Sequence, residues 1–271
     1  MASLKACCDI SKRTVENLSP LDFEVIPNEL RKVVHSVNNL LKSLDISLER
    51  QKRFTSNAAH ELRTPLAGIK VHAQNIPPEN ERLRRVQRNI ILGVDKLTHL
   101  FNQLITLSRA ETRNYKDKLD PIDLSSLFLA VLDEEYSEAI AAKKLQVETC
   151  FSNNLEVLSN KDALSIIIRN LLDNAVKYTP ENGVLCLVVG CDETGAFFVV
   201  EDNGPGLNEN DQTHACERFY RASTPETDGC GLGLSIVHQL CEQFTYSFDL
   251  SHSTKYEHGL KATISGFQTV V

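Results

Sequence analysis

The sequence lacks any stretch that is long and apolar enough to cross a lipid bilayer. No run of about 18 or more consecutive apolar residues occurs in its 271 residues. The first eight residues, from Met1 to Cys8, contain no apolar core of signal-peptide length. Within this sequence we therefore expect neither a transmembrane helix nor a secretory signal.

The eight cysteines form no recognisable metal-binding or disulfide pattern. The sequence contains no Cys-x-x-Cys pair and no Cys/His spacing typical of zinc ligands. Cys186, Cys191 and Cys241 lie in apolar segments. We therefore expect reduced, mostly structural thiols, as in a cytosolic protein.

The chain also has no excess of positive charge and no phosphate-binding P-loop. It has 29 Lys and Arg residues against 36 Asp and Glu residues, for a formal net charge of -7. Nucleic-acid-binding domains usually carry a basic face, so we expect no nucleic-acid partner. The motif Gly-x-x-x-x-Gly-Lys-Ser/Thr is absent, which argues against a P-loop kinase.

Long helical patterns occupy the first part of the chain, after a short helix expected near residues 4–16. One pattern runs from about 28 to 75 and the next from about 80 to 112, and both repeat apolar residues every seven positions. In the second pattern one such row is Leu83, Ile90, Leu97 and Leu104. A seam of this kind favours a coiled coil, although a single amphipathic helix packed on its own domain is the alternative.

The turn Ile76-Pro77-Pro78-Glu79 joins the two long patterns and predicts an antiparallel helical hairpin. One hairpin cannot bury its apolar stripe on all sides, whereas two hairpins can do so as a four-helix bundle. The sequence therefore predicts a homodimer, with His60 on the outward face of the bundle.

His60 and Glu61 lie side by side within the first long helical pattern, and Pro65 follows five residues after the histidine. On a helix, His60, Arg63 and Thr64 share one face. The pair can act as a nucleophilic imidazole and a carboxylate that accepts or orients its second ring proton. Taken alone, it could equally be a solvated surface pair.

From about residue 121 the chain alternates short strands and helices, after a polar segment at 114–120 that we expect to be a linker. Helices are predicted near 124–142, 161–178 and 232–243, and strands near 145–147, 184–189, 196–200, 247–251 and 260–264. Because strict βαβ alternation is absent, we expect an α/β sandwich with helices on one side of a sheet.

One face of the helix predicted at 161–178 carries Asn170, Asn174, Lys177 and Tyr178. Two amides, a cation and a phenol can provide oxygen ligands for Mg²⁺ and a positive charge for phosphate. An ordinary polar helix face is the alternative interpretation.

Two glycine-containing clusters follow. Asp202 ends a predicted strand, and a turn containing Gly204 and Gly206 comes directly after it. Its carboxylate can accept a hydrogen bond from an adenine amine, and the glycines leave the loop free to hinge. The second cluster opens a helix whose backbone amides can bind phosphate, and its glycines are Gly229, Gly231 and Gly233. About twenty polar residues between the clusters are interpreted as a lid.

In this order the motifs resemble those of the two-component sensor histidine kinases. The run from His60 to Leu66 is similar to the phosphoacceptor motif of that family. The three clusters are similar to its asparagine box and its two glycine boxes, and residues 217–221 to its phenylalanine box. Residues 4–50 resemble a HAMP signal relay, so the resemblance covers nearly the whole chain.

The resemblance implies an α+β fold in three parts. These are a HAMP-like relay at 1–50, a dimerisation and phosphoacceptor hairpin at 51–113, and a catalytic ATP-binding α/β sandwich at 114–271. It implies ATP and Mg²⁺ as cofactors, a homodimer, and a separate response regulator as partner. It also implies a cytoplasmic position for these residues, in a parent protein anchored in the bacterial inner membrane.

The resemblance also implies the roles of individual residues. His60 would carry the phosphoryl group, Glu61 would be the general base, and Thr64 would position water in a reverse phosphatase reaction. Asn170 and Asn174 would hold Mg²⁺. The nucleotide would be bound by Lys177, Tyr178, Asp202, Gly204, Gly206, Arg221, Gly229, Gly231 and Gly233.

Two other functions fit parts of the pattern. A dimeric relay scaffold could bind ATP without turning it over, although His60, Glu61, Asn174 and Asp202 are all intact. A mismatch-repair or heat-shock ATPase would share the sandwich, but it would have no phosphoacceptor hairpin. We therefore expect a protein-histidine kinase that is also a phosphatase.

Overall fold

A computed structural model of the protein describes residues 31–77, 80–112, 115–193, 195–222 and 230–270. The helix expected near residues 4–16 lies outside the described residues. The side chains of residues 47–61, which include His60 and Glu61, also lie outside them. The chain divides into two compact units, Met1–Pro65 and Leu66–Val271.

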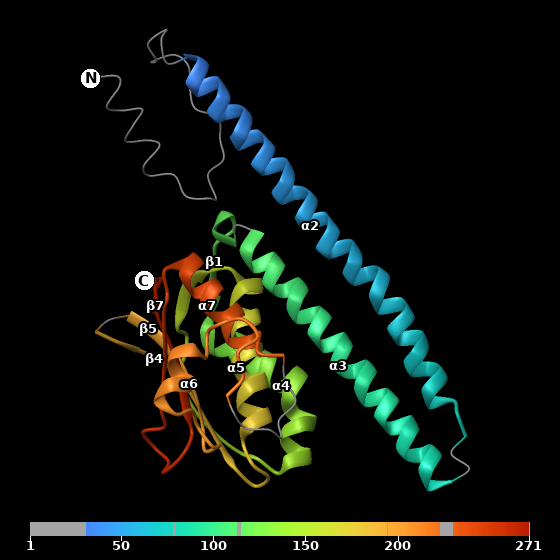
Figure 1. The fold of residues 1–271 in the computed structure, drawn as a ribbon. Coiled ribbons are helices and arrows are strands. Elements are labelled where there is room, and N and C mark those ends of the chain that lie inside the picture. Colours follow the sequence, from blue (N-terminus) through green and yellow to red (C-terminus); the bar gives the residue numbers. More distant parts are fainter. Residues whose placement is uncertain (1–30, 78–79, 113–114, 194, 223–229, 271) are drawn as a thin grey trace. The chain divides into compact units, whose positions relative to one another are not determined.

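Two long helices form the first part of the chain (Figure 1). Helix α2 spans Arg31–Gln74 and contains Pro65, and helix α3 spans Glu81–Thr112. Within the second unit, Lys70 of α2 forms an ion pair of 2.7 Å with Asp95 of α3. Gln87 Nε2 contacts the carbonyl oxygens at the end of α2, of which Ala73 O is nearest at 2.9 Å. These contacts hold together the part of the predicted hairpin that lies within the second unit.

The apolar row of α3 has a buried end and an exposed end. Leu104 is partly buried and packs against the main core, whereas Leu83, Ile90 and Leu97 are exposed in the single chain. Exposed leucine and isoleucine side chains in one helical row are typical of a surface that pairs with another helix.

The second unit contains a five-stranded sheet in the order β2-β4-β5-β7-β6. The strands are β2 (Gln146–Phe151), β4 (Val184–Asp192), β5 (Gly195–Asp202), β6 (Ser247–His252) and β7 (Leu260–Phe267). Strands β2 and β4 are parallel, and the other neighbours are antiparallel. A separate antiparallel pair is formed by β1 (Asp120–Asp123) and β3 (Glu156–Ser159).

Three helices cover one face of this sheet (Figure 1): α4 (Leu124–Lys143), α5 (Lys161–Tyr178) and α7 (Gly233–Phe244). The core lies between the two layers. There Phe128 of α4 and Phe198 of β5 are fully buried, with ring centroids 5.6 Å apart. Such burial of large apolar side chains is the main stabilising contribution to the domain.

The end of helix α5 is fixed by a side chain of helix α4. Lys143 Nζ donates hydrogen bonds to three carbonyl oxygens, those of Val176, Lys177 and Thr179, at 2.8, 2.8 and 2.9 Å. A cation at a helix C-terminus satisfies carbonyls that have no partner within the helix and interacts favourably with the helix dipole. The contact therefore fixes the turn that carries Lys177 and Tyr178.

The structure confirms a helical hairpin followed by an α/β sandwich and corrects some details. The expected linker at 114–120 contains the 3₁₀ helix η2 (Tyr115–Asp117), and Tyr115 is only 2% exposed. Asn160, the N-cap of α5, holds this segment by donating to Lys118 O at 2.9 Å. Strands β1 and β3 and the short helix α6 (Glu209–His214) were not predicted. None of the described helices has the length and apolar character needed to cross a membrane.

Candidate functional site

A cleft in the second unit brings together most of the site residues predicted for that unit. It is bordered by α5, by the segment after β5, by the start of α7 and by two residues of α3. The predicted residues in its lining are Asn174, Lys177, Tyr178, Asp202, Gly206, Arg221, Gly231 and Gly233. Four clusters that are distant in sequence therefore meet at one place.

Only part of the predicted polar face of helix α5 lines the cleft. Asn174, Lys177 and Tyr178 line the cleft, whereas Asn170 does not and is 8% exposed. Asn170 Nδ2 donates to Ile166 O at 2.8 Å, so its amide is bonded within its own helix. Lys177 Nζ lies 3.1 Å from the hydroxyl oxygen of Tyr178 and 4.5 Å from its ring centroid. The cation and the phenol therefore act as one pair at the cleft wall.

Asp202 is a buried carboxylate at the end of strand β5. It is 5% exposed, and its Oδ1 accepts hydrogen bonds from Gly204 N at 2.8 Å and from Leu260 N at 3.4 Å. Burial raises the pKa of Asp202 to about 6, because the two backbone donors only partly offset the loss of solvation. The Asp202 carboxylate is therefore a hydrogen-bond acceptor that is largely shielded from water.

Two predicted glycines occupy positions that a side chain would disturb, Gly231 in the cleft lining and Gly204 outside the lining. A Cβ on Gly204 would lie 2.8 Å from both Tyr178 O and Asp202 Oδ1. Gly231 has φ +66, and a Cβ there would lie 2.4 Å from Tyr220 O. Gly204 therefore permits close packing against Asp202, and Gly231 permits the turn that leads into helix α7.

Helix α7 begins at Gly233, and its N-cap residue Leu232 makes no side-chain capping bond. Its first backbone N–H groups have no acceptor within the helix, and this is the arrangement that binds phosphate in many proteins. Gly229 lies outside the described residues.

The segment before α7 contains the predicted phenylalanine box. Tyr220 donates a hydrogen bond of 2.6 Å to Asp211 of α6, and Phe219 N donates to Gly231 O at 2.8 Å. The Phe219 side chain is 60% exposed. Arg221 lines the cleft directly after this anchored pair.

The cleft also contains residues that we did not predict. Asp173 is one, and its carboxylate accepts a hydrogen bond of 2.8 Å from the hydroxyl of Tyr136, while burial raises its pKa. His99 and Gln103 of α3 are two others, and Leu260 of β7 is a fourth. Asp173 lies within the predicted asparagine cluster, but no signal in the sequence pointed to His99, Gln103 or Leu260.

Side-chain amides at this site could supply oxygen ligands for a divalent ion. Among the described residues, no group of three or more His, Cys, Asp or Glu side chains could hold a metal ion. The amides of Asn170 and Asn174 both face Gly233, with Asn170 Oδ1 3.3 Å from the position of a Cβ built on that glycine. Two amide oxygens beside a helix N-terminus that could bind phosphate fit a hard ion such as Mg²⁺, which keeps several waters and phosphate oxygens as ligands.

The phosphoacceptor motif lies on helix α2. Residues His60 and Glu61 are part of this helix, although their side chains lie outside the described residues. Thr64 is exposed one turn after His60. Thr64 follows His60 by four residues along the same helix.

Comparisons with known proteins agree with this arrangement. Residues 50–113 match the His Kinase A (phospho-acceptor) domain. Residues 159–267 match the histidine kinase-, DNA gyrase B-, and HSP90-like ATPase family. Sensor protein QseC of Salmonella typhimurium is 33% identical over 259 residues, which cover 93% of this chain and 56% of that protein. The chain belongs to the two-component sensor histidine kinases.

Other sensor histidine kinases show the same likeness. Sensor protein kinase PmrB of Pseudomonas aeruginosa is 32% identical over 241 residues, which cover 86% of this chain and 49% of that protein. The chain thus spans about half the length of these two curated relatives. Among solved structures, full-length ShkA in complex with AMPPNP has a TM-score of 0.63 and 25% identity, over 81% of this chain and 46% of that one.

The raised pKa of Asp202 predicts a pH-dependent effect on the stability of this histidine kinase. Its carboxyl has a pKa of about 6 in the folded chain against an ordinary value of 3.8, so the folded state binds this proton more tightly. The neutral form therefore stabilises the fold below about pH 4, and that stabilisation is lost as the pH rises through 6. At pH 7.5, Asp202→Asn should raise the free energy of unfolding by up to about 3 kcal/mol.

Urea unfolding at pH 4 and pH 7.5 would measure this effect. At pH 4 the Asp202→Asn and wild-type chains should be nearly equal in stability. The exposed Asp249 of β6 offers a matched control, and Asp249→Asn should show no such difference between the two pH values. Equal stabilisation by Asp202→Asn at both pH values would contradict the assignment.

Proposed function

We propose that this chain is the ATP-dependent kinase part of a sensor protein and that it phosphorylates its own His60. The phosphoryl group then passes to an aspartate of a separate response regulator. The observation that carries the proposal is the cleft in which Asp202, Asn174 and the Gly231–Gly233 turn meet. It lies in an ATPase-type domain, and the matched phosphoacceptor domain contains His60.

In this proposal ATP binds with its adenine against Asp202 and Tyr178. The buried Asp202 carboxylate accepts a hydrogen bond from the adenine amine, and a desolvated acceptor of this kind discriminates strongly against a base that lacks the donor. Gly204 and Gly206 allow the following lid to hinge. The complex of ShkA with AMPPNP, an ATP analogue, supports a nucleotide in a domain of this fold.

The triphosphate would extend from Lys177 toward the start of α7. There the backbone amides of the turn that contains Gly231 and Gly233 would cradle phosphate oxygens, and Arg221 would reach the γ-phosphate. Asn174 and Asn170 would hold Mg²⁺, which would neutralise charge that develops on the phosphate oxygens. Asn174 is the better placed of the two, because it lines the cleft and Asn170 does not.

The reaction is an in-line displacement. An imidazole nitrogen of His60 forms a bond to the γ-phosphorus while the bond from that phosphorus to the β,γ-bridging oxygen breaks, and ADP leaves. Glu61 accepts the proton of the other ring nitrogen, which keeps the attacking nitrogen nucleophilic. A carboxylate of the regulator then attacks the phosphohistidine, and His60 is restored.

The same chain is proposed to remove the phosphoryl group from the regulator. Thr64 is exposed on α2 one turn after His60, so its hydroxyl can orient a water for attack on an aspartyl phosphate. A kinase and phosphatase that share one helix face would set the level of phosphorylated regulator in both directions.

The proposed assembly is a homodimer of hairpins in a four-helix bundle. The exposed row of Leu83, Ile90 and Leu97 on α3 supports it, because a bundle would remove these side chains from water. Residues 51–113 would form this hairpin, residues 1–50 a HAMP-like relay, and residues 114–271 the catalytic domain. The parent is proposed to be a membrane-anchored bacterial sensor with this part in the cytoplasm, since the relatives are sensor proteins about twice as long.

Incubation with γ-³²P ATP and Mg²⁺ tests the kinase proposal. The wild type should acquire label that is lost in acid and retained in alkali, and His60→Ala should acquire none. His72 lies on the same helix and is exposed, so His72→Ala is the matched control and should keep the label. Label that persists in His60→Ala, or nucleotide binding without any label, would contradict the proposal, and the second outcome would favour a non-catalytic scaffold.

A Thr64→Ala variant tests the phosphatase proposal. It should acquire label at His60 like the wild type, but it should dephosphorylate a regulator labelled by this kinase at least about tenfold more slowly. Thr106 is a suitable control, since its hydroxyl is bonded to Asn102 O on α3 at 2.9 Å. Unchanged dephosphorylation in Thr64→Ala would exclude the role given to its hydroxyl.

A further inference from the structure

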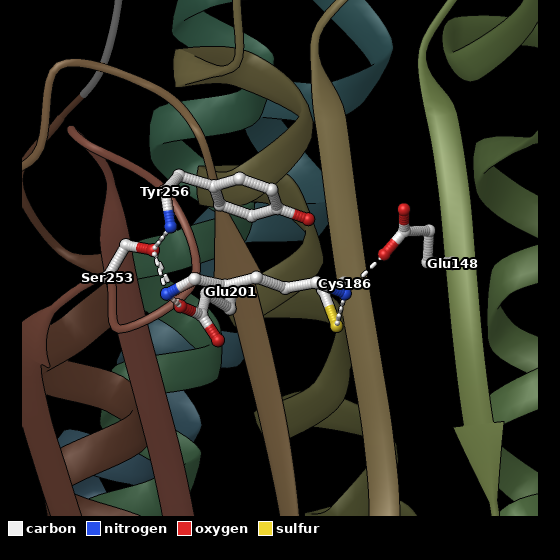
Figure 2. Close-up of polar contacts among 6 residues, drawn as sticks. Glu148, Cys186, Glu201, Ser253 and Tyr256 are labelled. Atoms are coloured by element: carbon white, nitrogen blue, oxygen red, sulfur yellow. Dashed lines mark hydrogen bonds and ion pairs between the residues drawn. The ribbon is translucent and has the colours of Figure 1, made fainter.

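The connection between β6 and β7, residues 253–259, is attached to the sheet through a buried carboxylate that the proposed reaction does not use. Glu201 precedes Asp202 on β5, and side chains alternate along a strand, so the two carboxylates point to opposite faces of the sheet. Glu201 is 5% exposed and points toward this connection (Figure 2).

Three donors of the connection converge on a single oxygen of Glu201. Its Oε1 accepts from Ser253 Oγ at 2.6 Å, from Thr254 N at 2.8 Å and from Lys255 N at 3.0 Å. Ser253 Oγ in turn accepts from Tyr256 N at 2.8 Å. Hydrogen bonds to a buried charge are among the strongest in proteins, so Glu201 fixes the start of the connection.

The side chain of Lys255 extends this attachment to two more strands, where it contacts Glu148 and Cys186, both labelled in Figure 2. Its Nζ forms an ion pair with Glu148 of β2 and lies 3.5 Å from Cys186 Sγ of β4. Glu148, Cys186 and Glu201 are neighbours in the registers of β2, β4 and β5. The start of the connection is therefore attached to three adjacent strands.

The end of the connection packs against Asp202. Ser253 N donates to Gly259 O at 3.1 Å, which couples the start of the connection to its end. A Cβ on Gly259 would lie 1.9 Å from Asp202 O, so the two backbones are in direct contact. The next residue, Leu260, donates its N–H to Asp202 Oδ1 at 3.4 Å and lines the cleft. A shift at Ser253 would thus be transmitted to the Asp202 carboxylate.

We propose that Glu201 is a positioning residue for adenine recognition. It holds the connection so that Gly259 and Leu260 keep the Asp202 carboxylate in the orientation that accepts the adenine amine. Loss of Glu201 would leave three donors without their acceptor, and the connection would have to move to satisfy them with water. This inference rests on the proposed function, in which Asp202 binds adenine.

The test compares two nucleotides that differ only in the group that Asp202 would recognise. ATP and purine riboside 5′-triphosphate, which lacks the 6-amino group, would compete with a fluorescent nucleotide for the full chain in the presence of Mg²⁺. The wild type should prefer ATP by about tenfold or more. This preference is the Kd for purine riboside 5′-triphosphate divided by the Kd for ATP. In Glu201→Ala the ratio of the two Kd values should fall below about threefold.

Three further variants show whether Glu201 positions the Asp202 carboxylate or only stabilises the fold. Glu201→Gln retains an acceptor oxygen and should keep most of the preference for ATP. Glu148→Gln removes only the negative charge that pairs with Lys255 Nζ and should leave the ratio unchanged. Ser253→Ala removes one donor to Glu201, and its ratio should lie between those of the wild type and Glu201→Ala.

The outcomes are distinguishable. If Glu201→Ala weakens both nucleotides equally and keeps the ratio, Glu201 is only structural and the inference is wrong. If Glu201→Ala does not fold by circular dichroism, an unchanged ratio in Ser253→Ala overturns the inference and a reduced one supports it. If the wild type does not prefer ATP over purine riboside 5′-triphosphate, Asp202 does not recognise the adenine amine. The same conclusion follows if Asp202→Ala keeps the full preference for ATP.

Discussion

The burial of one carboxylate, that of Asp202, constrains the architecture of the catalytic domain. A carboxylate at the end of a central strand loses most of its hydration, and two backbone N–H groups restore only part of it. These donors come from Gly204, directly after β5, and from Leu260, which is far away in sequence. The turn after β5 and the β6–β7 connection must therefore both be in place before the site has its shape.

Helix α5 connects this site to the rest of the domain. Its apolar face packs on the sheet, its polar face borders the cleft, and Lys143 of α4 fixes its C-terminal turn. Because Lys177 and Tyr178 lie on that turn, the packing of α4 on α5 also determines where a cation and a phenol stand in the nucleotide cleft. Stability and binding thus depend on the same contacts.

Local patterns in the sequence predicted much of this fold and site. Asn170 and Asn174 indicated the polar face of the helix predicted at 161–178, and the predicted strand that ends at Asp202 indicated the acceptor. What the sequence could not show are contacts between segments far apart in the chain. Tyr115 lies in a polar segment and yet is buried, and neither Leu260 nor Glu201 has a local signal that relates it to Asp202. Strands β1 and β3 have four residues each, too few for a clear alternating pattern.

An experimental structure of the chain with AMPPNP and Mg²⁺ would test adenine recognition by Asp202 directly. The adenine amine should lie within hydrogen-bonding distance of the Asp202 carboxylate, with the phosphates beside Gly231 and Gly233 and the metal on the amide oxygen of Asn174. If the adenine amine instead faces solvent or pairs with another residue, Asp202 does not recognise adenine.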